Sequence, residues 1–98
     1  MTEEAFLQHM QEVTLVVRHK VGLHARPAAV FVQTAKKFKS AVSISKDAME
    51  VDAKSILSIL TLAVNQGATI KIKANGEDEQ AVVKALQDLV EANFGESA

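Results

Sequence analysis

The chain has 98 residues and a formal net charge of −1 at pH 7, with 11 basic and 12 acidic side chains. Its length suits one domain, and its hydrophobic fraction of 48% is enough for one compact core. It contains no cysteine, which excludes disulfides, thiolate chemistry and cysteine-ligated zinc. The apolar runs are much shorter than the roughly 18 residues of a membrane span, and the acidic start lacks the basic region of a signal peptide. We therefore expect a cytoplasmic protein without direct membrane insertion.

The first ten residues are acidic and then moderately apolar, and they precede the patterned part of the chain. We interpret residues 1–10 as an N-terminal extension and residues 11–98 as one domain. Apolar residues then alternate at Val13, Leu15 and Val17, which predicts a strand over residues 12–18. His19 comes directly after it, and its place suggests a solvated strand-end residue rather than a second functional base.

The segment over residues 22–28, Gly-Leu-His-Ala-Arg-Pro-Ala, reads as a turn that leads into a helix. Pro27 fits the first helical turn, where its missing N–H leaves no intrahelical bond unmade, so we expect the helix to begin near Ala25. His24 is then at the N-terminal edge, where free N–H groups and the helix dipole favour an anion such as phosphate. Arg26 adds a permanent cation with donors that suit phosphate oxygens.

These residue types suit a histidine that carries a phosphoryl group. Neutral imidazole is a nucleophile near pH 7, and a nearby helix N-terminus disfavours the imidazolium form of His24. The same dipole then stabilises the phosphoryl dianion, by about 0.3–1 kcal/mol at an exposed helix end, so the group stays transferable. The simpler alternative is that His24 is an ordinary helix-start residue and Arg26 a solvated charge.

The next elements follow from the spacing of apolar residues. A stripe at three- and four-residue steps predicts a helix over residues 25–37 that lies on a sheet. Val42 and Ile44 alternate with serines and predict a second strand, and a turn through residues 46–48 leads to a short strand over residues 50–52.

A second helix is expected from Ser55, at the N-cap position, to about residue 64, with apolar side chains on more than one face. These side chains cannot all be buried in one core. A short helix that is apolar on two sides often presents one side to a partner, although core packing claims several of its residues. Gly67 marks the exit from this segment.

The last part of the domain repeats these patterns. Ile70, Ile72 and Ala74 alternate with lysines and predict a fourth strand, and an apolar stripe over residues 82–90 predicts a final helix. The acidic residues 77–79 suit the positive end of that helix better than metal or acid–base chemistry. With three dispersed histidines and no cysteine, we expect no metal site and no cofactor, and we expect residues 95–98 to be a loose tail.

The resulting order is strand, helix, strand, strand, helix, strand, helix. It predicts an α+β domain with the helices gathered on one face of a four-stranded sheet. Periodicity by itself does not define the order of the strands in that sheet.

Residues 22–28 resemble the active-site signature of HPr, the histidine-containing phosphocarrier of the phosphoenolpyruvate-dependent sugar phosphotransferase system. Residues 54–57, Lys-Ser-Ile-Leu, resemble the family's regulatory serine segment, and residues 76–80 resemble the entry of its last helix. The resemblance covers roughly residues 11–94. It implies an open-faced sandwich, βαββαβα, in which three helices cover one face of an antiparallel sheet.

The resemblance also implies roles for individual residues. His24 would accept a phosphoryl group from phospho-enzyme I and donate it to enzyme IIA of sugar permeases, with Arg26 stabilising the phosphate. Ser55 would be a regulatory phosphoserine, modified by a serine kinase/phosphorylase and recognised by a catabolite-control regulator. The residues implied in partner binding are Ala25, Pro27, Ile56, Leu57 and Leu60. The protein would act as a monomeric carrier and not as an enzyme with independent turnover.

Other functions remain open at this point. A regulatory interaction module would use the helix after Ser55, a carrier in a non-sugar phosphotransferase branch would use His24 with other partners, and a small-ligand-binding domain would leave residues 22–28 unexplained. Residues 18–39 contain six basic side chains and no acidic one, which suits acidic or phosphorylated partners. Nucleic acid is not expected, because aromatic residues are not interleaved with these charges and the overall balance is slightly acidic.

Overall fold

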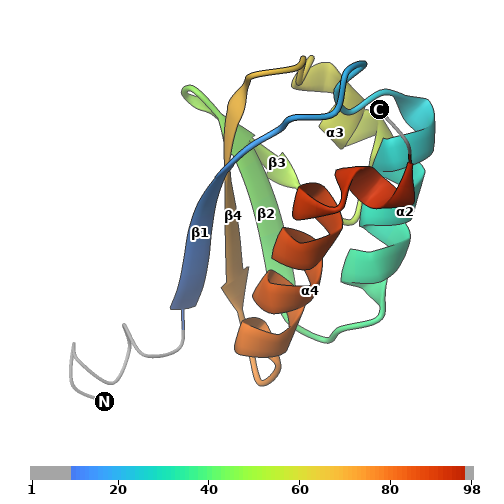
Figure 1. The fold of residues 1–98 in the computed structure, drawn as a ribbon. Coiled ribbons are helices and arrows are strands. Elements are labelled where there is room, and N and C mark those ends of the chain that lie inside the picture. Colours follow the sequence, from blue (N-terminus) through green and yellow to red (C-terminus); the bar gives the residue numbers. More distant parts are fainter. Residues whose placement is uncertain (1–9, 97–98) are drawn as a thin grey trace.

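The computed structural model describes residues 10–96, which form one four-stranded sheet with helices on one face (Figure 1). The strands lie in the order β1-β4-β2-β3, and each neighbouring pair is antiparallel. Their bounds are Met10–Val16 for β1, Ala41–Lys46 for β2, Met49–Asp52 for β3 and Thr69–Asn75 for β4. The central position of β4 is a tertiary feature that the strand patterns do not specify.

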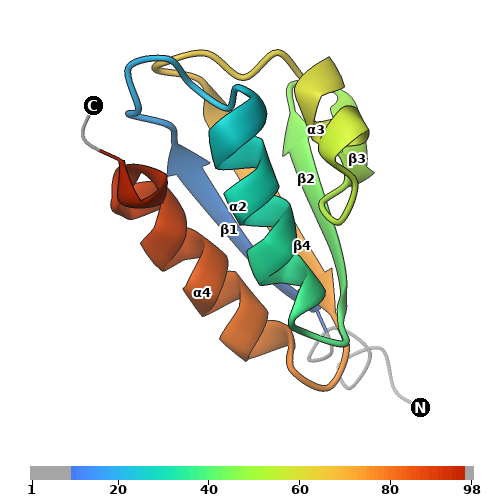
Figure 2. The ribbon, with the colours of Figure 1, turned by 90° about the vertical axis from the view of Figure 1, so that its right-hand side faces the viewer.

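The helices are α2 (Ala25–Lys36), α3 (Ile56–Thr61) and α4 (Glu79–Glu91), and a short 3₁₀ helix, η1 (Asn93–Gly95), follows α4. In Figures 1 and 2, α2 and α4 lie across the same face of the sheet, and α3 lies beside the start of α2. This arrangement confirms the predicted α+β open-faced sandwich.

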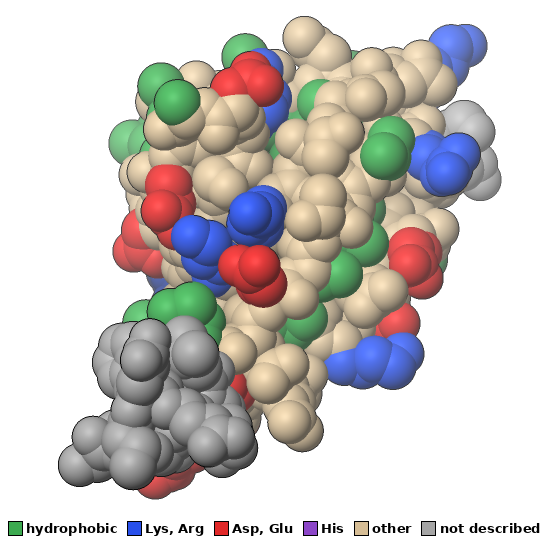
Figure 3. Space-filling model, turned by 90° about the vertical axis from the view of Figure 1, so that its left-hand side faces the viewer, with side chains coloured by type: hydrophobic (Ala, Val, Ile, Leu, Met, Phe, Trp, Pro, Cys, Tyr) green, Lys and Arg blue, Asp and Glu red, His purple; other side chains and the backbone are tan. Residues whose placement is uncertain are grey.

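Alternation along the strands separates a buried face of the sheet from an open one. In β4, Ile70, Ile72 and Ala74 are buried under the helices, whereas Lys71 and Lys73 point to the other side. The open face carries side chains of both charge signs (Figure 3), including Lys73, whose Nζ lies 3.9 Å from Oε1 of Glu50. Charged side chains that face water keep this side of the sheet from becoming a second apolar core.

The core lies between the sheet and the helices. Its largest fully buried side chains come from all of these layers, which is why the elements cannot fold independently of one another. They include Phe31, Ile44, Ile59, Ile70, Ile72 and Leu86.

Two elements, β1 and α3, differ from their predicted bounds by two residues or more. Strand β1 begins and ends two residues earlier, because after Val16 the chain leaves the ladder and Val17 exchanges backbone hydrogen bonds with Ala68 and Gly67. Helix α3 begins as predicted, after Ser55, but ends at Thr61, and Ala63 takes a left-handed conformation with φ of 51°. Met10 is the first residue of β1, and the rest of the predicted extension, residues 1–9, lies outside the described residues.

The acidic residues at the start of α4 have different contacts. Glu79 lies in the first turn, as predicted, and its Oε1 accepts the N–H of Gly76 at 3.1 Å. Asp78 occupies the N-cap position, but its carboxylate accepts hydrogen bonds from the backbone N–H groups of Lys39 and Ser40 and from the Ser40 hydroxyl. The Ser40 hydroxyl bond and the Lys39 N–H bond lower the pKa of Asp78 to about 2. Asp78 therefore ties the start of α4 to the segment between α2 and β2.

No helix within residues 10–96 is long and apolar enough to cross a membrane.

Candidate functional site

The loop before α2 is held by backbone bonds on both sides. Gly22 has φ of +76°, and its N–H donates to the carbonyl of His19 at 3.0 Å. The N–H of Leu23 donates to the carbonyl of Val64 at 2.9 Å, which joins the loop to the segment after α3. A left-handed glycine at this point lets the chain turn sharply into the helix.

His24 is the N-cap residue of α2, as the sequence predicts. Its backbone is extended, with φ of −78° and ψ of −175°, and its carbonyl accepts the N–H of Ala28 at 3.0 Å. The imidazole makes no capping hydrogen bond among the described residues, and the side chain is 40% exposed. The first N–H groups of α2 have no intrahelical partner, so they are available to an anion at this end.

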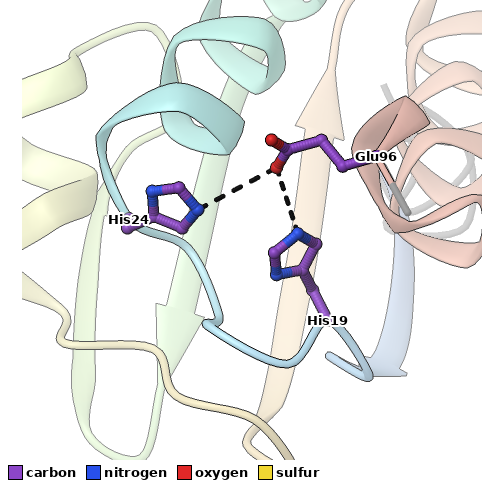
Figure 4. Close-up of side chains that lie close together, drawn as sticks. All are labelled: His19, His24 and Glu96. Carbon is purple, nitrogen blue, oxygen red and sulfur yellow. Dashed lines mark ion pairs between the residues drawn. The ribbon is translucent and has the colours of Figure 1, made fainter. Parts of the chain in front are cut away.

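The two ring nitrogens of His24 have different surroundings. Nε2 points toward Glu96 and lies 3.9 Å from its Oε1, whereas Nδ1 is on the side of the ring that faces away from Glu96 (Figure 4). A carboxylate near one ring nitrogen favours a proton there and leaves the lone pair on the other nitrogen. The geometry thus favours Nδ1 as the nucleophilic atom.

Arg26 lies one residue inside the helix and is held only loosely. Its side chain is 80% exposed, and Nη1 lies 3.8 Å from Oε2 of Glu96. An exposed ion pair at this distance contributes little to stability, on the order of 0–1 kcal/mol. The guanidinium can therefore leave Glu96 for another anion at small cost.

His19 is buried, and the interpretation of it as a solvated strand-end residue is wrong. It is 4% exposed, its Nδ1 accepts the backbone N–H of Val21 at 3.1 Å, and its Nε2 lies 3.0 Å from Oε1 of Glu96. The cause is the early end of β1, which lets the following residues turn inward over the core instead of continuing along the sheet edge.

Glu96 belongs to the site although the sequence places it in a tail. Three successive residues after α4, Asn93, Phe94 and Gly95, have positive φ angles of 54°, 58° and 77°. They turn the chain back so that Phe94 is buried and packs edge-on against His19, with ring centroids 6.0 Å apart. The loose-tail prediction is therefore wrong for Gly95 and Glu96, and residues 97–98 lie outside the described residues.

His19, His24 and Glu96 form a cluster whose candidate ligand atoms lie within 4.8 Å of one another, so two of the histidines are not dispersed as the sequence suggests. The hydrogen bonding of His19 nevertheless disfavours a metal. Its Nδ1 accepts a backbone N–H, so we assign the single proton of the neutral ring to Nε2. A protonated nitrogen cannot coordinate a cation.

The predicted regulatory residue and partner surface occupy α3. Ser55 is the N-cap, and its Oγ accepts the N–H of Ser58 at 3.3 Å. Three apolar side chains of this helix face solvent, namely Ile56 at 39%, Leu57 at 78% and Leu60 at 36% exposure. We call these three residues the α3 patch. The remaining large apolar side chains of this segment, Ile59, Leu62 and Val64, are buried.

The site and the α3 patch lie at one end of the molecule. Figures 1 and 2 show the start of α2 between α3 and the end of the described chain after η1. Among the predicted partner-binding residues at the start of α2, Ala25 is exposed and Pro27 is buried. A partner that reaches His24 can therefore also reach α3 and Ala25, but not the Pro27 side chain.

Known proteins with similar sequences and structures share one family. Residues 11–92 match the family model described as "PTS HPr component phosphorylation site". Phosphocarrier protein HPr of Xylella fastidiosa is 45% identical over 87 residues, which cover 89% of this chain and 98% of that protein.

Two solved structures are also similar. HPr of Thermoanaerobacter tengcongensis superposes with a TM-score of 0.87 at 52% identity, covering 90% of this chain and 99% of that one. Crh, a catabolite repression protein of Bacillus subtilis described as a domain-swapped dimer, superposes with a TM-score of 0.69 at 46% identity. The match covers 81% of this chain and 91% of the Crh chain. Together with a site that presents an exposed histidine at a helix N-terminus, these matches show that the chain belongs to the HPr family of phosphocarrier proteins of the phosphotransferase system.

Proposed function

We propose that His24 accepts a phosphoryl group from phospho-enzyme I and donates it to enzyme IIA of a sugar permease. The observation that carries this proposal is the position of His24, which is partly exposed at the N-cap of α2 with Nε2 toward Glu96 and with Nδ1 on the side of the ring that faces away from it. The protein is then a carrier and needs no cofactor, because the donor supplies the activated group and the acceptor removes it.

The chemical step balances without an external base. The Nδ1 lone pair attacks phosphorus, an N–P bond forms, and the bond between phosphorus and the donor breaks with its electron pair going to the donor. The proton on Nε2 stays on the ring. Free N–H groups at the start of α2 and the guanidinium of Arg26 stabilise the dianion that results.

The α3 patch supplies the docking surface. It presents three apolar side chains next to the start of α2, and Arg18, Lys20 and Arg26 add basic side chains to the segment that holds His24. The other basic residues of 18–39 lie at the opposite end of α2, so the basic block does not surround His24 as a whole. An apolar patch with basic side chains beside it would complement an apolar surface with an acidic rim on enzyme I and on enzyme IIA. Ala25 extends this surface toward the nucleophile.

Ser55 is the regulatory site of this scheme. It stands at the beginning of α3 and is partly exposed, so a serine kinase/phosphorylase can reach it. A phosphate there adds about two negative charges beside the α3 patch, which opposes docking of an acidic partner. It also creates a recognition feature for a catabolite-control regulator.

A regulatory interaction module is the second candidate function, because Ser55 and the α3 patch could serve a partner without His24. A carrier in a non-sugar branch would use the same chemistry with other partners. In each case we propose a cytoplasmic monomer that binds no nucleic acid, with its contacts to partners made by the end of the molecule that carries His24.

One experiment separates a carrier from a binding module. The protein is incubated with enzyme I and labelled phosphoenolpyruvate, and the label is tested for acid lability and mapped by mass spectrometry. Acid-labile label on His24, absent from His24→Ala, is the expected result, and the variant should keep the parent's thermal midpoint because His24 lies outside the core. Label elsewhere, or equal labelling of the variant, contradicts the proposal.

A further inference from the structure

We propose that Glu96, held in place by the buried His19, is a positioning residue that keeps the proton of His24 on Nε2 and so leaves Nδ1 as the nucleophile. This inference rests on the proposed function of His24. It assigns a role to two residues outside the 22–28 segment, one before it and one at the end of the described chain.

The first step is the tautomer of the neutral His19 ring. Its ring is buried, and Nδ1 accepts the N–H of Val21, so Nδ1 carries a lone pair and the ring proton of the neutral form is on Nε2. That N–H lies 3.0 Å from Oε1 of Glu96. Neither atom has another hydrogen-bond partner among the described residues, and the pair is close without being well aligned. The Nε2–H group therefore faces the carboxylate as its single available acceptor.

The second step is the arrangement around Glu96. Its Oε1 faces both histidines, at 3.0 Å from Nε2 of His19 and 3.9 Å from Nε2 of His24, and its Oε2 lies 3.8 Å from Nη1 of Arg26. One carboxylate thus contacts the proposed nucleophile, the proposed phosphate-stabilising residue and a buried histidine (Figure 4). A carboxylate placed against one ring nitrogen selects the tautomer and stabilises the imidazolium that forms during attack.

The third step is the backbone that delivers Glu96. Asn93 and Phe94 adopt the left-handed conformation, which Asn tolerates but which is unusual for a bulky residue such as Phe94, and Phe94 packs against the ring of His19. Strained backbone of this kind persists when the surrounding structure determines it, and it is concentrated at functional sites. Here the strain turns the chain so that Glu96 reaches the start of α2.

The same contacts indicate how the site responds when a phosphoryl group is transferred to Nδ1 of His24. Bond formation at Nδ1 places positive charge on the ring, which Glu96 stabilises from the opposite edge. Arg26, which is exposed and only 3.8 Å from Glu96, is free to turn toward the new dianion. Because His19 keeps the carboxylate near the ring, Glu96 does not follow Arg26.

The test uses two variants of His19 that separate its two contacts. His19→Asn keeps a short side-chain acceptor for the N–H of Val21 but cannot reach Glu96, whereas His19→Gln places an amide donor near Glu96. Glu96→Gln removes the carboxylate itself, and Glu91→Gln removes an exposed carboxylate from the end of α4 as the charge-matched control. Thermal unfolding shows whether each variant keeps the fold.

Two readouts distinguish positioning from a merely structural role. Long-range proton–nitrogen NMR reports the tautomer of His24, and rapid-quench kinetics with saturating phospho-enzyme I report the rate of phosphoryl acceptance. We expect His19→Asn and Glu96→Gln to lose the Nε2–H preference and to accept the group roughly fivefold more slowly, the scale of one partly exposed charge contact. His19→Gln and Glu91→Gln should match the parent.

The outcomes separate this inference from the proposed function. An unchanged tautomer and rate in folded Glu96→Gln, or equal loss in His19→Gln and His19→Asn, overturns the inference. A parent protein that accepts no phosphoryl group, in which Glu96→Gln still changes the tautomer as expected, counts against the proposed function and leaves the positioning role in place.

Discussion

Gly22 lies against the carbonyl group of Val64, so close that a Cβ atom on residue 22 would be 2.2 Å from that oxygen. The contact joins the loop that presents His24 to the segment that follows α3. The proposed phosphoryl acceptor, His24, and the α3 patch are therefore parts of one backbone arrangement, and a change at this contact should affect both.

Replacing Gly22 with alanine should destabilise the protein by about 3 kcal/mol, because strain at a positive φ adds to a steric clash with backbone. Gly67→Ala is the matched control, since Gly67 also has positive φ but a Cβ there would meet nothing within 4 Å. That variant should lose only about 1–2 kcal/mol. Urea unfolding measures both free energies, and equal losses would show that the Val64 contact is unimportant.

Arg26→Ala should slow phosphoryl acceptance by His24 roughly fivefold without abolishing it, because the helix N–H groups still stabilise the dianion. Arg26→Lys keeps the charge but not the planar fork of donors, so it should fall between the parent and the alanine variant. Single-turnover kinetics measure the rates. If Arg26→Ala is as fast as the parent, Arg26 is a solvated charge without a role in transfer.

Leu57→Glu should weaken association with enzyme I at least tenfold, since Leu57 is 78% exposed at the centre of the α3 patch and a charge there opposes apolar contact. Met49→Glu is the control, because Met49 is an apolar residue on β3 that is 50% exposed and lies outside the α3 patch. Both variants should unfold within about 0.5 kcal/mol of the parent. Calorimetric titration tests the prediction, and equal affinities for the two variants would remove the α3 patch from the docking surface.

Ser55→Asp should slow phosphorylation of His24 by enzyme I while leaving the thermal midpoint nearly unchanged, because a negative charge enters the docking surface without disturbing the core. Ser55→Ala provides the contrast. It removes the hydrogen bond to the N–H of Ser58, so it should cost roughly 0.5–1 kcal/mol of stability but leave transfer at the parent rate. Parent-like transfer in Ser55→Asp would contradict the inhibitory role.

The pKa of Asp78 predicts how acid affects stability. The hydrogen bonds from Ser40 and Lys39 lower this pKa from its ordinary value of 3.8 to about 2 in the folded state. A carboxylate with a depressed folded pKa stabilises the fold above its unfolded pKa, and this contribution is lost as pH falls through about 4 to about 2.

Asp78→Asn should therefore be less stable than the parent at pH 7, and the difference should shrink as the pH approaches 2. Denaturant unfolding at several pH values measures it. Asp88→Asn is the control, because it removes an exposed ion pair with Lys84 and should change stability little. If the difference in unfolding free energy between Asp78→Asn and the parent does not change with pH, the charge of Asp78 does not stabilise its contact with Lys39 and Ser40.

Local patterns in the sequence were sufficient for the features that depend on neighbouring residues. The helix start at Ala25 and the N-cap positions of His24 and Ser55 follow from turn and capping preferences within a few residues. The alternation in β4 separates its two faces in the same way, because successive side chains of a strand point to opposite sides. The crowding of apolar residues in α3 also predicted that some of them would be exposed.

Only the tertiary structure decided the surroundings of His24. His19 is buried because β1 leaves the sheet after Val16. The register between β1 and β4 determines that point, and the apolar pattern of β1 does not predict it. Glu96 reaches the site because three residues with positive φ follow α4. Asn and Gly adopt this conformation readily, but nothing in the local sequence indicates it for Phe94. Glu96 meets His19 and His24, which lie far from it in the sequence, because α4 packs against the sheet with its C-terminal end beside the start of α2. The pattern of no single segment predicts that packing.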